Sequence, residues 1–235
     1  MQLFYNSRID KDTKEISFDK IESKHIVKVL RKKEGDQIFI MNGRGELFIC
    51  EITAANHKRC IVSIISREEK KPQRDYYLHV VISPLKNNDR FEWFLEKATE
   101  IGIDEITPII CENSEKKFIK PERLEKIILA ATKQSLKFKL PKLNNLISFG
   151  DFLKKEHKNT VYIAHCENSD KKHLKTCIKP KESVTILIGP EGDFSSKEIS
   201  NGIKSGFIPI TLGNTRLRTE TAAIVAVQNI SFINQ

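Results

Sequence analysis

The chain has 235 residues, of which 39% are hydrophobic and 8% aromatic, a composition typical of a soluble globular protein with one large domain or two small ones. No apolar run approaches the roughly 20 residues that cross a bilayer, and the N-terminus lacks the pattern of a signal peptide, so we expect a cytoplasmic protein with no membrane partner. The net charge of +9 favours a polyanionic partner, RNA or DNA, although a generally lysine-rich proteome would give the same surplus.

Residues 1–70 read mainly as strands. Residues 38–41 and 46–53 flank the glycine-rich turn 42–45 and predict a hairpin, and residues 60–65 supply a further strand. Several short strands with turn signals and few helices suggest a small β-barrel.

One clear helix is predicted in this part, from Ile21 to Leu30. It carries His25 and Lys28 and is followed by Arg31 and two lysines. Such a cluster is either a solvated basic face, the usual fate of a charge run, or a surface that grips phosphates.

The polar run 67–75, which contains one proline, is the best candidate for a domain boundary. From residue 76 onward, strands alternate with helices, which implies a largely parallel sheet with helices on both faces. The predicted strands are residues 77–83, 106–111, 160–164, 184–188 and 208–212.

Three helices of this region have clear signals. Apolar residues recur at helical spacing from Phe91 to Ile101, before a stop at Gly102, and Pro121 opens another helix. The helix Thr219–Phe232 is apolar or small around most of its circumference. It must therefore be buried, inside the domain or against a second copy of the chain.

The five cysteines support neither a disulfide framework nor a zinc site, because their number is odd and no two have C-x-x-C spacing. We therefore predict no metal. Cys50, Cys60 and Cys111 lie in or beside apolar runs and are most simply small core residues. His165 and Cys166 are adjacent, as a catalytic pair could be, but no orienting partner accompanies them in the sequence.

Two strand–loop–helix units near the C-terminus organise the chain. The strand 184–188 runs into Gly189 and Gly192, and the strand 208–212 runs into Gly213. Ligands of open α/β sheets bind at the carboxyl ends of strands, so two such loops predict one site. Ser195 and Glu198 have the spacing of a capping box for the first following helix.

The glycine loops match neither a Walker A loop nor the dinucleotide fingerprint. A pair of tight turns would explain the glycines without any ligand. Against that interpretation, Arg216, Arg218 and Glu220 stand between a buried strand and a buried helix, and charged residues in such a place suggest a working cleft.

Several motifs together resemble a known family. They are Ile188-Gly-Pro-Glu-Gly192 with Phe194-Ser195 and Glu198, Leu212-Gly213, Leu217-Arg-Thr-Glu-Thr-Ala222, the segments His25–Arg31 and Glu96–Gly102, Gly35-Asp36, the Gly43/Gly45 turn and Gln134-Ser135. In order and approximate spacing they resemble the RsmE family of SPOUT-class methyltransferases, which act on 16S ribosomal RNA. The resemblance covers essentially the whole chain.

The resemblance implies an α/β fold: a C-terminal SPOUT domain over 76–235 with a parallel sheet and a deep trefoil knot, preceded by a PUA-like β-barrel over 1–70 that binds RNA. It also implies S-adenosylmethionine as cofactor, a homodimer, and methylation of uracil N3 at a specific uridine of 16S rRNA in the small ribosomal subunit.

The same resemblance suggests roles for individual residues. Arg218 would stabilise the negative charge that develops on the uracil oxygens, and Glu191 or Glu220 would accept the N3 proton or position the base. Glu220 could instead simply be a carboxylate favoured at a helix N-terminus. The expected cofactor contacts are Leu187, Ile188, Gly189, Gly192, Leu212, Gly213 and Leu217. The expected RNA contacts are His25, Lys28, Arg31, Lys86 and Arg216.

The chain departs from the family pattern at three places. Asp193 stands where a second glycine is usual, Asn113 where arginine is usual, and Leu136-Lys137 where Gly-Arg is usual. Lysine keeps the charge of arginine but loses its bidentate geometry, so RNA contacts are affected more than methyl transfer. Two other functions stay open: 2′-O-ribose methylation, and a non-catalytic RNA-binding or ribosome-assembly role.

Overall fold

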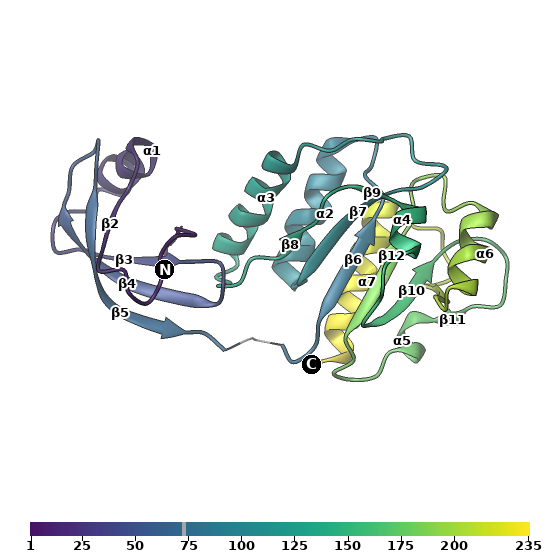
Figure 1. The fold of residues 1–235 in the computed structure, drawn as a ribbon. Coiled ribbons are helices and arrows are strands. Elements are labelled where there is room, and N and C mark those ends of the chain that lie inside the picture. Colours follow the sequence, from purple (N-terminus) through teal and green to yellow (C-terminus); the bar gives the residue numbers. More distant parts are fainter. Residues whose placement is uncertain (72–73) are drawn as a thin grey trace. The chain divides into compact units, whose positions relative to one another are not determined.

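A computed structural model describes residues 1–71 and 74–235 (Figure 1). The chain divides into two compact units, Met1–Gln73 with Thr132–Leu140, and Arg74–Ala131 with Pro141–Gln235. Pro72 and Gln73, which belong to the predicted boundary segment, lie outside the described residues. Within the described residues, no helix has the length and apolar character needed to cross a membrane.

The first unit contains a five-stranded sheet in the order β1-β3-β4-β5-β2. Its strands are β1 (Leu3–Tyr5), β2 (Glu15–Ser17), β3 (Gln37–Met41), β4 (Glu46–Ala54) and β5 (Ile61–Glu69). The predicted hairpin is confirmed, because β3 and β4 pair antiparallel with Ile40 opposite Phe48. Alternate residues of these strands, including Ile38, Ile40 and Val62, are buried in one core.

The turn between β3 and β4 makes a contact that the sequence did not suggest. Gly43 has a φ of 77°, and a Cβ there would lie 2.8 Å from Leu140 Cδ1. The backbone N–H of Leu140 donates to Gly43 O at 2.9 Å, and that of Gly45 donates to Phe138 O at 2.9 Å. Glycine at position 43 is therefore required by both its backbone angle and the approach of Leu140.

The helix predicted at Ile21–Leu30 is present but changes its winding. α1 (Lys20–Lys24) is capped by Asp19, and it continues as one π-helical turn, η1 (His25–Val29). Ile26 is fully buried in the core of the first unit, whereas Ile21 is 80% exposed.

The second unit is an α/β structure around an eight-stranded sheet in which every pairing is parallel. The order is β11-β13-β10-β12-β6-β7-β8, with β9 also beside β7. The strands are β6 (Leu78–Ile82), β7 (Glu105–Ile110), β8 (Lys142–Leu143), β9 (Ile147–Ser148), β10 (Thr160–Ala164), β11 (Lys172–His173), β12 (Val184–Ile188) and β13 (Ile208–Thr211). The predicted parallel sheet is confirmed.

Helices cover both faces of this sheet. They are α2 (Asn88–Ile101), α3 (Pro121–Gln134), α4 (Phe149–Leu153), α5 (Leu174–Cys177), α6 (Ser196–Lys204) and α7 (Thr219–Ile233). Val81 and Leu187 pack with Phe149 of α4 and Ile199 of α6. Because neighbouring strand residues point to opposite faces, the other face is the one covered by α7, which packs on α2, β6 and β12 (Figure 1).

The cysteines behave as predicted. Cys50, Cys60 and Cys111 are buried, and burial raises the pKa of the Cys50 thiol to about 12, so it is inert at neutral pH. Cys166 is exposed, and its neighbour His165 has no hydrogen bond from either ring nitrogen within the described part of the chain. The two side chains therefore do not form the bonded pair that a cysteine nucleophile requires.

Candidate functional site

A cavity of about 770 Å³ opens at the carboxyl ends of β10, β12 and β13 in the second unit. The segments that follow these three strands form its wall, together with Arg90 from the first turn of α2. Of the predicted site residues, the lining includes Ile188, Gly189, Glu191, Leu212, Gly213, Arg216, Leu217, Arg218 and Glu220. The two glycine loops thus meet in one place, as expected for adjacent strands of a parallel sheet.

The loop after β12 is held close to its own helix. A Cβ on Gly189 would lie 3.0 Å from Phe194 Cδ2, so a side chain there would displace a buried ring. Ser195 and Glu198 form the predicted capping box, and Glu198 Oε1 also accepts a hydrogen bond from the Glu112 N–H at 2.9 Å. Two predicted cofactor contacts do not line the cavity: Leu187 is fully buried in the core, and Gly192 faces Asn113.

The loop after β13 is closed by Thr211, the last residue of that strand. Thr211 Oγ1 accepts a hydrogen bond from the Gly213 N–H at 3.3 Å and donates to Gly213 O at 2.9 Å. Gly213 has a φ of 148°, which lies in the region that favours glycine. Arg218 then serves as the N-cap of α7 without a side-chain capping bond, so its exposed guanidinium remains available at the cavity.

Glu220 is the buried charge of the cavity. Its side chain is only 10% exposed, and Oε1 lies 3.7 Å from Nε of Arg90, whose side chain is 44% exposed. Sequence reasoning missed Arg90, since it belongs to the helix after β6, far from the glycine loops in the chain. The signal that could have found it is its place in the first turn after a buried parallel strand, at the same edge of the sheet.

Asp193 and Asn113, two of the residues that depart from the expected family pattern, stabilise the loop after β12. Asp193 has a φ of 64°, and its carboxylate accepts hydrogen bonds from the N–H groups of Cys166 and Phe194, at 2.6 and 2.8 Å. Asn113 Nδ2 donates to the carbonyl oxygens of Gly192 and Asp193, at 3.1 Å each. Both side chains therefore fix the backbone of the loop, and the extra carboxylate of Asp193 is satisfied by backbone donors.

His165 contributes a polar group with no partner. Its side chain is buried at the cavity wall, neither ring nitrogen is hydrogen-bonded within the described part of the chain, and burial lowers the pKa of the imidazole. A buried polar group without a partner is costly, so this neutral ring is suited to bind a polar group of a ligand in the cavity.

Glu191 and Lys86 are exposed at the rim. Glu191 Oε1 accepts a hydrogen bond from the Lys86 N–H at 3.0 Å. The Lys86 ammonium pairs with Glu115 at 2.9 Å, and this hydrogen bond and charge raise the pKa of Lys86. The backbone of Lys86 thus holds the Glu191 side chain in place. Through Lys86, the edge of the cavity extends from the loop after β12 to Glu115.

The remaining predicted RNA contacts belong to the first unit. His25 packs edge-on against Phe4, and its Nε2 lies 3.1 Å from Gln2 Nε2. Lys28 is exposed. Arg31 lines a shallow hollow of about 510 Å³ with Lys32 and Lys33. These side chains form a basic surface, and His25 is partly occupied in packing.

The chemistry of the cavity is that of a polar organic ligand. Its volume lies in the range of about 300–1,000 Å³ that is usual for small-molecule sites, and it offers backbone groups, apolar walls, two arginines of the loop after β13 and one buried carboxylate. Among the described residues, no group of three or more His, Cys, Asp or Glu side chains is placed to hold a metal ion.

Comparison with known proteins agrees with this chemistry. Residues 71–231 match the family model of an RNA methyltransferase domain, and residues 18–65 match that of an RNA methyltransferase PUA domain. The fold and the cavity therefore define an RNA methyltransferase that carries a PUA domain.

A ribosomal RNA small subunit methyltransferase E of Buchnera aphidicola is 31% identical over 220 residues, which cover 90% of this chain and 88% of the relative. The chain belongs to the ribosomal RNA small subunit methyltransferase E family, as the sequence motifs predicted.

Two solved structures share the whole fold. A crystal structure from Porphyromonas gingivalis, described as a probable rRNA-methyltransferase, is 36% identical with a TM-score of 0.93 and covers 100% of this chain and 98% of that one. A Legionella pneumophila methyltransferase in complex with bound S-adenosylmethionine is 27% identical with a TM-score of 0.87 and covers 99% and 97%.

Proposed function

We propose that this protein methylates N3 of a uridine in 16S ribosomal RNA, with S-adenosylmethionine as methyl donor. Membership of the family supports the reaction class and the ribosomal RNA substrate. The observation that carries the proposal is the convergence of both glycine loops, Arg218 and Glu220 on one cavity at the ends of parallel strands.

The cavity fits an adenosyl cofactor. The loops after β12 and β13 offer backbone N–H and C=O groups beside Ile188, Leu212 and Leu217, which suits a purine between apolar walls. The neutral His165 ring supplies one hydrogen bond to a polar group of the ligand. When bound, the cofactor supplies an electrophilic methyl group and needs no metal.

Arg218 acts on the substrate base. Uracil N3 carries a proton, and as this proton leaves, negative charge spreads to the two ring oxygens. The exposed guanidinium of Arg218 at the cavity is free to donate hydrogen bonds to such an oxygen, and such donors stabilise charge that develops in the transition state. Arg216, on the same loop and also exposed, would contact an RNA phosphate or a neighbouring base.

Either Glu191 or Glu220 accepts the N3 proton or positions the base. Glu220 is buried and held by Arg90, whereas Glu191 is exposed at the rim and held by the Lys86 backbone. The variants Glu191→Gln and Glu220→Gln show which of the two glutamates accepts the proton. The variant that lacks the proton acceptor should lose turnover, and the acidic limb of its pH–rate profile should become flatter. A profile unchanged in both variants would exclude both residues as the acceptor.

The finer features of the family fold are also proposals. We propose that residues 1–70 form a PUA-like β-barrel that binds RNA and that residues 76–235 form the methyltransferase domain. A trefoil knot is supported by the return of the chain: β13 lies beyond β10, yet the following helix α7 packs on β12, β6 and α2.

A homodimer is supported by α7, because Phe232 is 72% exposed and Val225 only half-buried. We also propose a cytoplasmic location, which a ribosomal RNA substrate supports.

The test uses purified protein, S-adenosylmethionine with a labelled methyl group, and small ribosomal subunits that lack the modification. Nuclease digestion followed by mass analysis identifies the product, and 3-methyluridine is expected. A 2′-O-methylated nucleoside would reassign the enzyme to ribose methylation. Tight cofactor binding without transfer to any RNA would contradict the enzymatic function and favour an RNA-binding role.

A further inference from the structure

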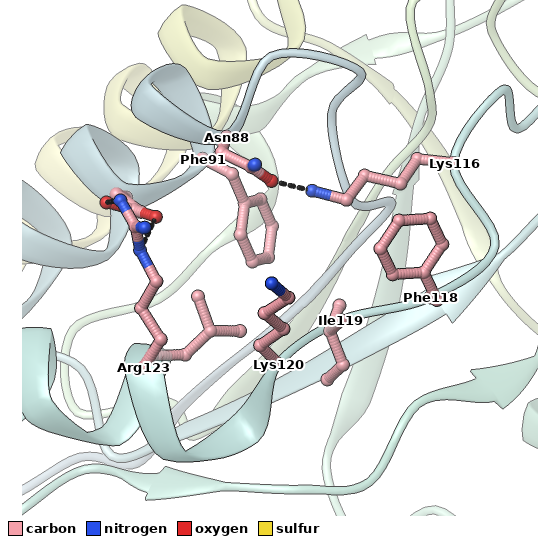
Figure 2. Close-up of a pocket in the computed structure, with 9 residues that line it drawn as sticks. Asn88, Phe91, Lys116, Phe118, Ile119, Lys120 and Arg123 are labelled. Carbon is pink, nitrogen blue, oxygen red and sulfur yellow. Dashed lines mark hydrogen bonds and ion pairs between the residues drawn. The ribbon is translucent and has the colours of Figure 1, made fainter.

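A second, smaller hollow lies in the same unit, outside the cavity described above. It has a volume of about 50 Å³ and is lined by the first turns of α2 and α3 and by the segment between residues 116 and 120 (Figure 2). Its nine lining residues are Asn88, Phe91, Glu92, Lys116, Phe118, Ile119, Lys120, Arg123 and Leu124.

The hollow carries an excess of positive charge. Three of its lining residues are cations and only Glu92 is a carboxylate. Arg123 engages both oxygens of Glu92, with Nη2 to Oε2 at 2.9 Å and Nε to Oε1 at 2.5 Å. The positive charges of Lys116 and Lys120 are therefore not neutralised by an ion pair of their own. Lys116 donates a hydrogen bond to the neutral Asn88 side chain, and Lys120 has no ion-pair partner among the described residues.

Lys116 is the more constrained of the two. Its burial, and the nearby charges of Arg123 and Lys120, lower the pKa of the ammonium, against the opposing effect of Glu92. Figure 2 shows the Lys116 side chain directed at Asn88 and the Lys120 ammonium pointing toward the Phe91 ring. Two like charges held over one hollow repel each other, and an anion bound between them removes that repulsion.

An aromatic side chain stands beside these charges. Phe118 is 65% exposed, and the Lys116 ammonium lies 5.7 Å from its ring centroid. Proteins that bind single-stranded nucleic acid combine an exposed aromatic ring with neighbouring cations. A base stacks on the ring, and the adjoining phosphate binds the cations. A free inorganic anion would occupy the cations but not the ring.

The hollow and the main cavity flank the same helical turn. Arg90 lines the main cavity, whereas Asn88, Phe91 and Glu92 line the hollow. One helix, about 10–12 Å across, therefore separates them. Along the rim, Glu191 binds the Lys86 N–H, Lys86 pairs with Glu115, and Glu115 precedes Lys116 in the chain. A strand that delivers one base to the cavity can thus follow a continuous edge to the hollow.

We propose that this hollow is a second RNA site of the methyltransferase unit: Lys116 and Lys120 bind a backbone phosphate of the substrate strand, and Phe118 stacks on an adjoining base near the methylated uridine. The inference rests on the proposed function for the identity of the RNA. It names residues on the segment 116–120, which contains three lysines and Phe118 and which the sequence motifs had left without a role.

The first test measures binding of a labelled single-stranded RNA that contains the target uridine, at several salt concentrations. The double variant Lys116→Gln/Lys120→Gln should bind more weakly and lower the slope of log affinity against log salt by about 0.7 for the lost phosphate contact. Phe118→Ala should weaken binding at least about fivefold at every salt concentration. Lys126→Gln, an exposed lysine further along α3, is the matched control and should change neither quantity.

The second test is steady-state methylation of small subunits by the same variants. The KM for RNA should rise while kcat and the affinity for S-adenosylmethionine, measured by calorimetry, stay close to those of the wild type. Unchanged RNA affinity and salt slope in folded variants would overturn the inference, as would a change in oligomeric state without a change in RNA affinity. If the wild type transfers no methyl group, and the variants nevertheless bind RNA more weakly than the wild type, the proposed function fails and the RNA site stands.

Discussion

The carboxylate of Asp193 bonds to the backbone N–H of Cys166 across 2.6 Å, and so joins the loop after β12 to the segment after β10. Asp193 does this with a φ of 64°, a conformation that costs a non-glycine residue free energy. A charge-assisted hydrogen bond of this kind typically contributes about 1.5–3 kcal/mol, enough to offset the strain. Asp193 is therefore a brace for the cavity wall.

The variant Asp193→Ala tests this brace. It keeps the strain of a side chain at positive φ but removes both hydrogen bonds, so we expect the unfolding free energy to fall by about 1–3 kcal/mol. The affinity for S-adenosylmethionine should weaken as well, since the wall becomes mobile. Asp193→Gly loses the bonds but relieves the strain and should fall between the wild type and Asp193→Ala. Denaturant unfolding and calorimetry measure the two effects; equal behaviour of alanine and wild type would show that the bond to Cys166 contributes nothing.

Arg218→Ala should lower turnover by about 10²–10³-fold, the usual effect of removing one donor to a developing oxyanion. Cofactor affinity should change little, because the side chain is exposed at the cavity and is proposed to contact the base rather than the cofactor. Arg218→Lys keeps a charge without the planar fork and should recover only part of the rate.

Single-turnover methylation of small subunits gives the rate of transfer, and calorimetry gives the cofactor affinity. Lys204→Ala, which removes an exposed charge at the end of α6, serves as a control for the loss of surface charge. A turnover of Arg218→Ala close to that of the wild type would remove Arg218 from the catalytic residues.

Local signals in the sequence predicted the parts of this site that are encoded locally. The apolar runs at residues 184–188 and 208–212, the capping box of Ser195 and Glu198, and the clustering of charge at Arg218 and Glu220 are all short-range patterns, and the structure contains each of them. The reason is physical: strand burial and helix capping depend on residues within a few positions of one another.

The parts of the site that the sequence did not predict depend on which strands and helices are neighbours in the fold. Arg90 reaches Glu220 because α2 packs on α7, although the two helices are far apart in the chain, and periodicity carries no information on which elements are neighbours. The same holds for Asp193 with Cys166. The π-helical turn at His25–Val29 was missed for another reason, because the side-chain pattern of one such turn is too short to differ from that of an α-helix.

The stability of the protein should decline in mildly acidic solution because of His79. Burial lowers the pKa of this imidazole from 6.5 to about 4, and Nε2 lies 2.7 Å from Thr107 Oγ1. The unfolded state binds the proton below pH 6.5, whereas the folded state does not until about pH 4. The stabilisation is therefore complete above pH 6.5 and is lost as the pH falls toward 4, by about 3 kcal/mol in all.

Urea unfolding at a series of pH values between 7.5 and 4.5 measures this loss. His79→Gln should show a smaller decline over the window than the wild type, since one group with unequal protonation in the two states is gone. His57→Gln changes an exposed histidine and should keep the decline of the wild type. Parallel curves for the wild type and His79→Gln would contradict the assignment.

The two sides of α7 should respond differently to a negative charge. Ala226 is a fully buried residue of α7, the helix that packs on α2, β6 and β12, whereas Phe232 is 72% exposed. Ala226→Glu should prevent folding, because an unpaired carboxylate in that core costs several kcal/mol. Phe232→Glu should leave the fold intact and convert the proposed dimer to a monomer, because it places a charge in the apolar patch left by Val225 and Phe232.

Light scattering reports the mass of each variant in solution, and circular dichroism reports its fold. Ser200→Glu provides the control, since residue 200 is an exposed polar position of α6, away from this face of α7, and gains the same charge. A Phe232→Glu protein that keeps the mass of a dimer would place the contact between copies elsewhere than on this face of α7. A wild type that is already monomeric would exclude the dimer itself, and the exposed ring would then have to be explained by another partner.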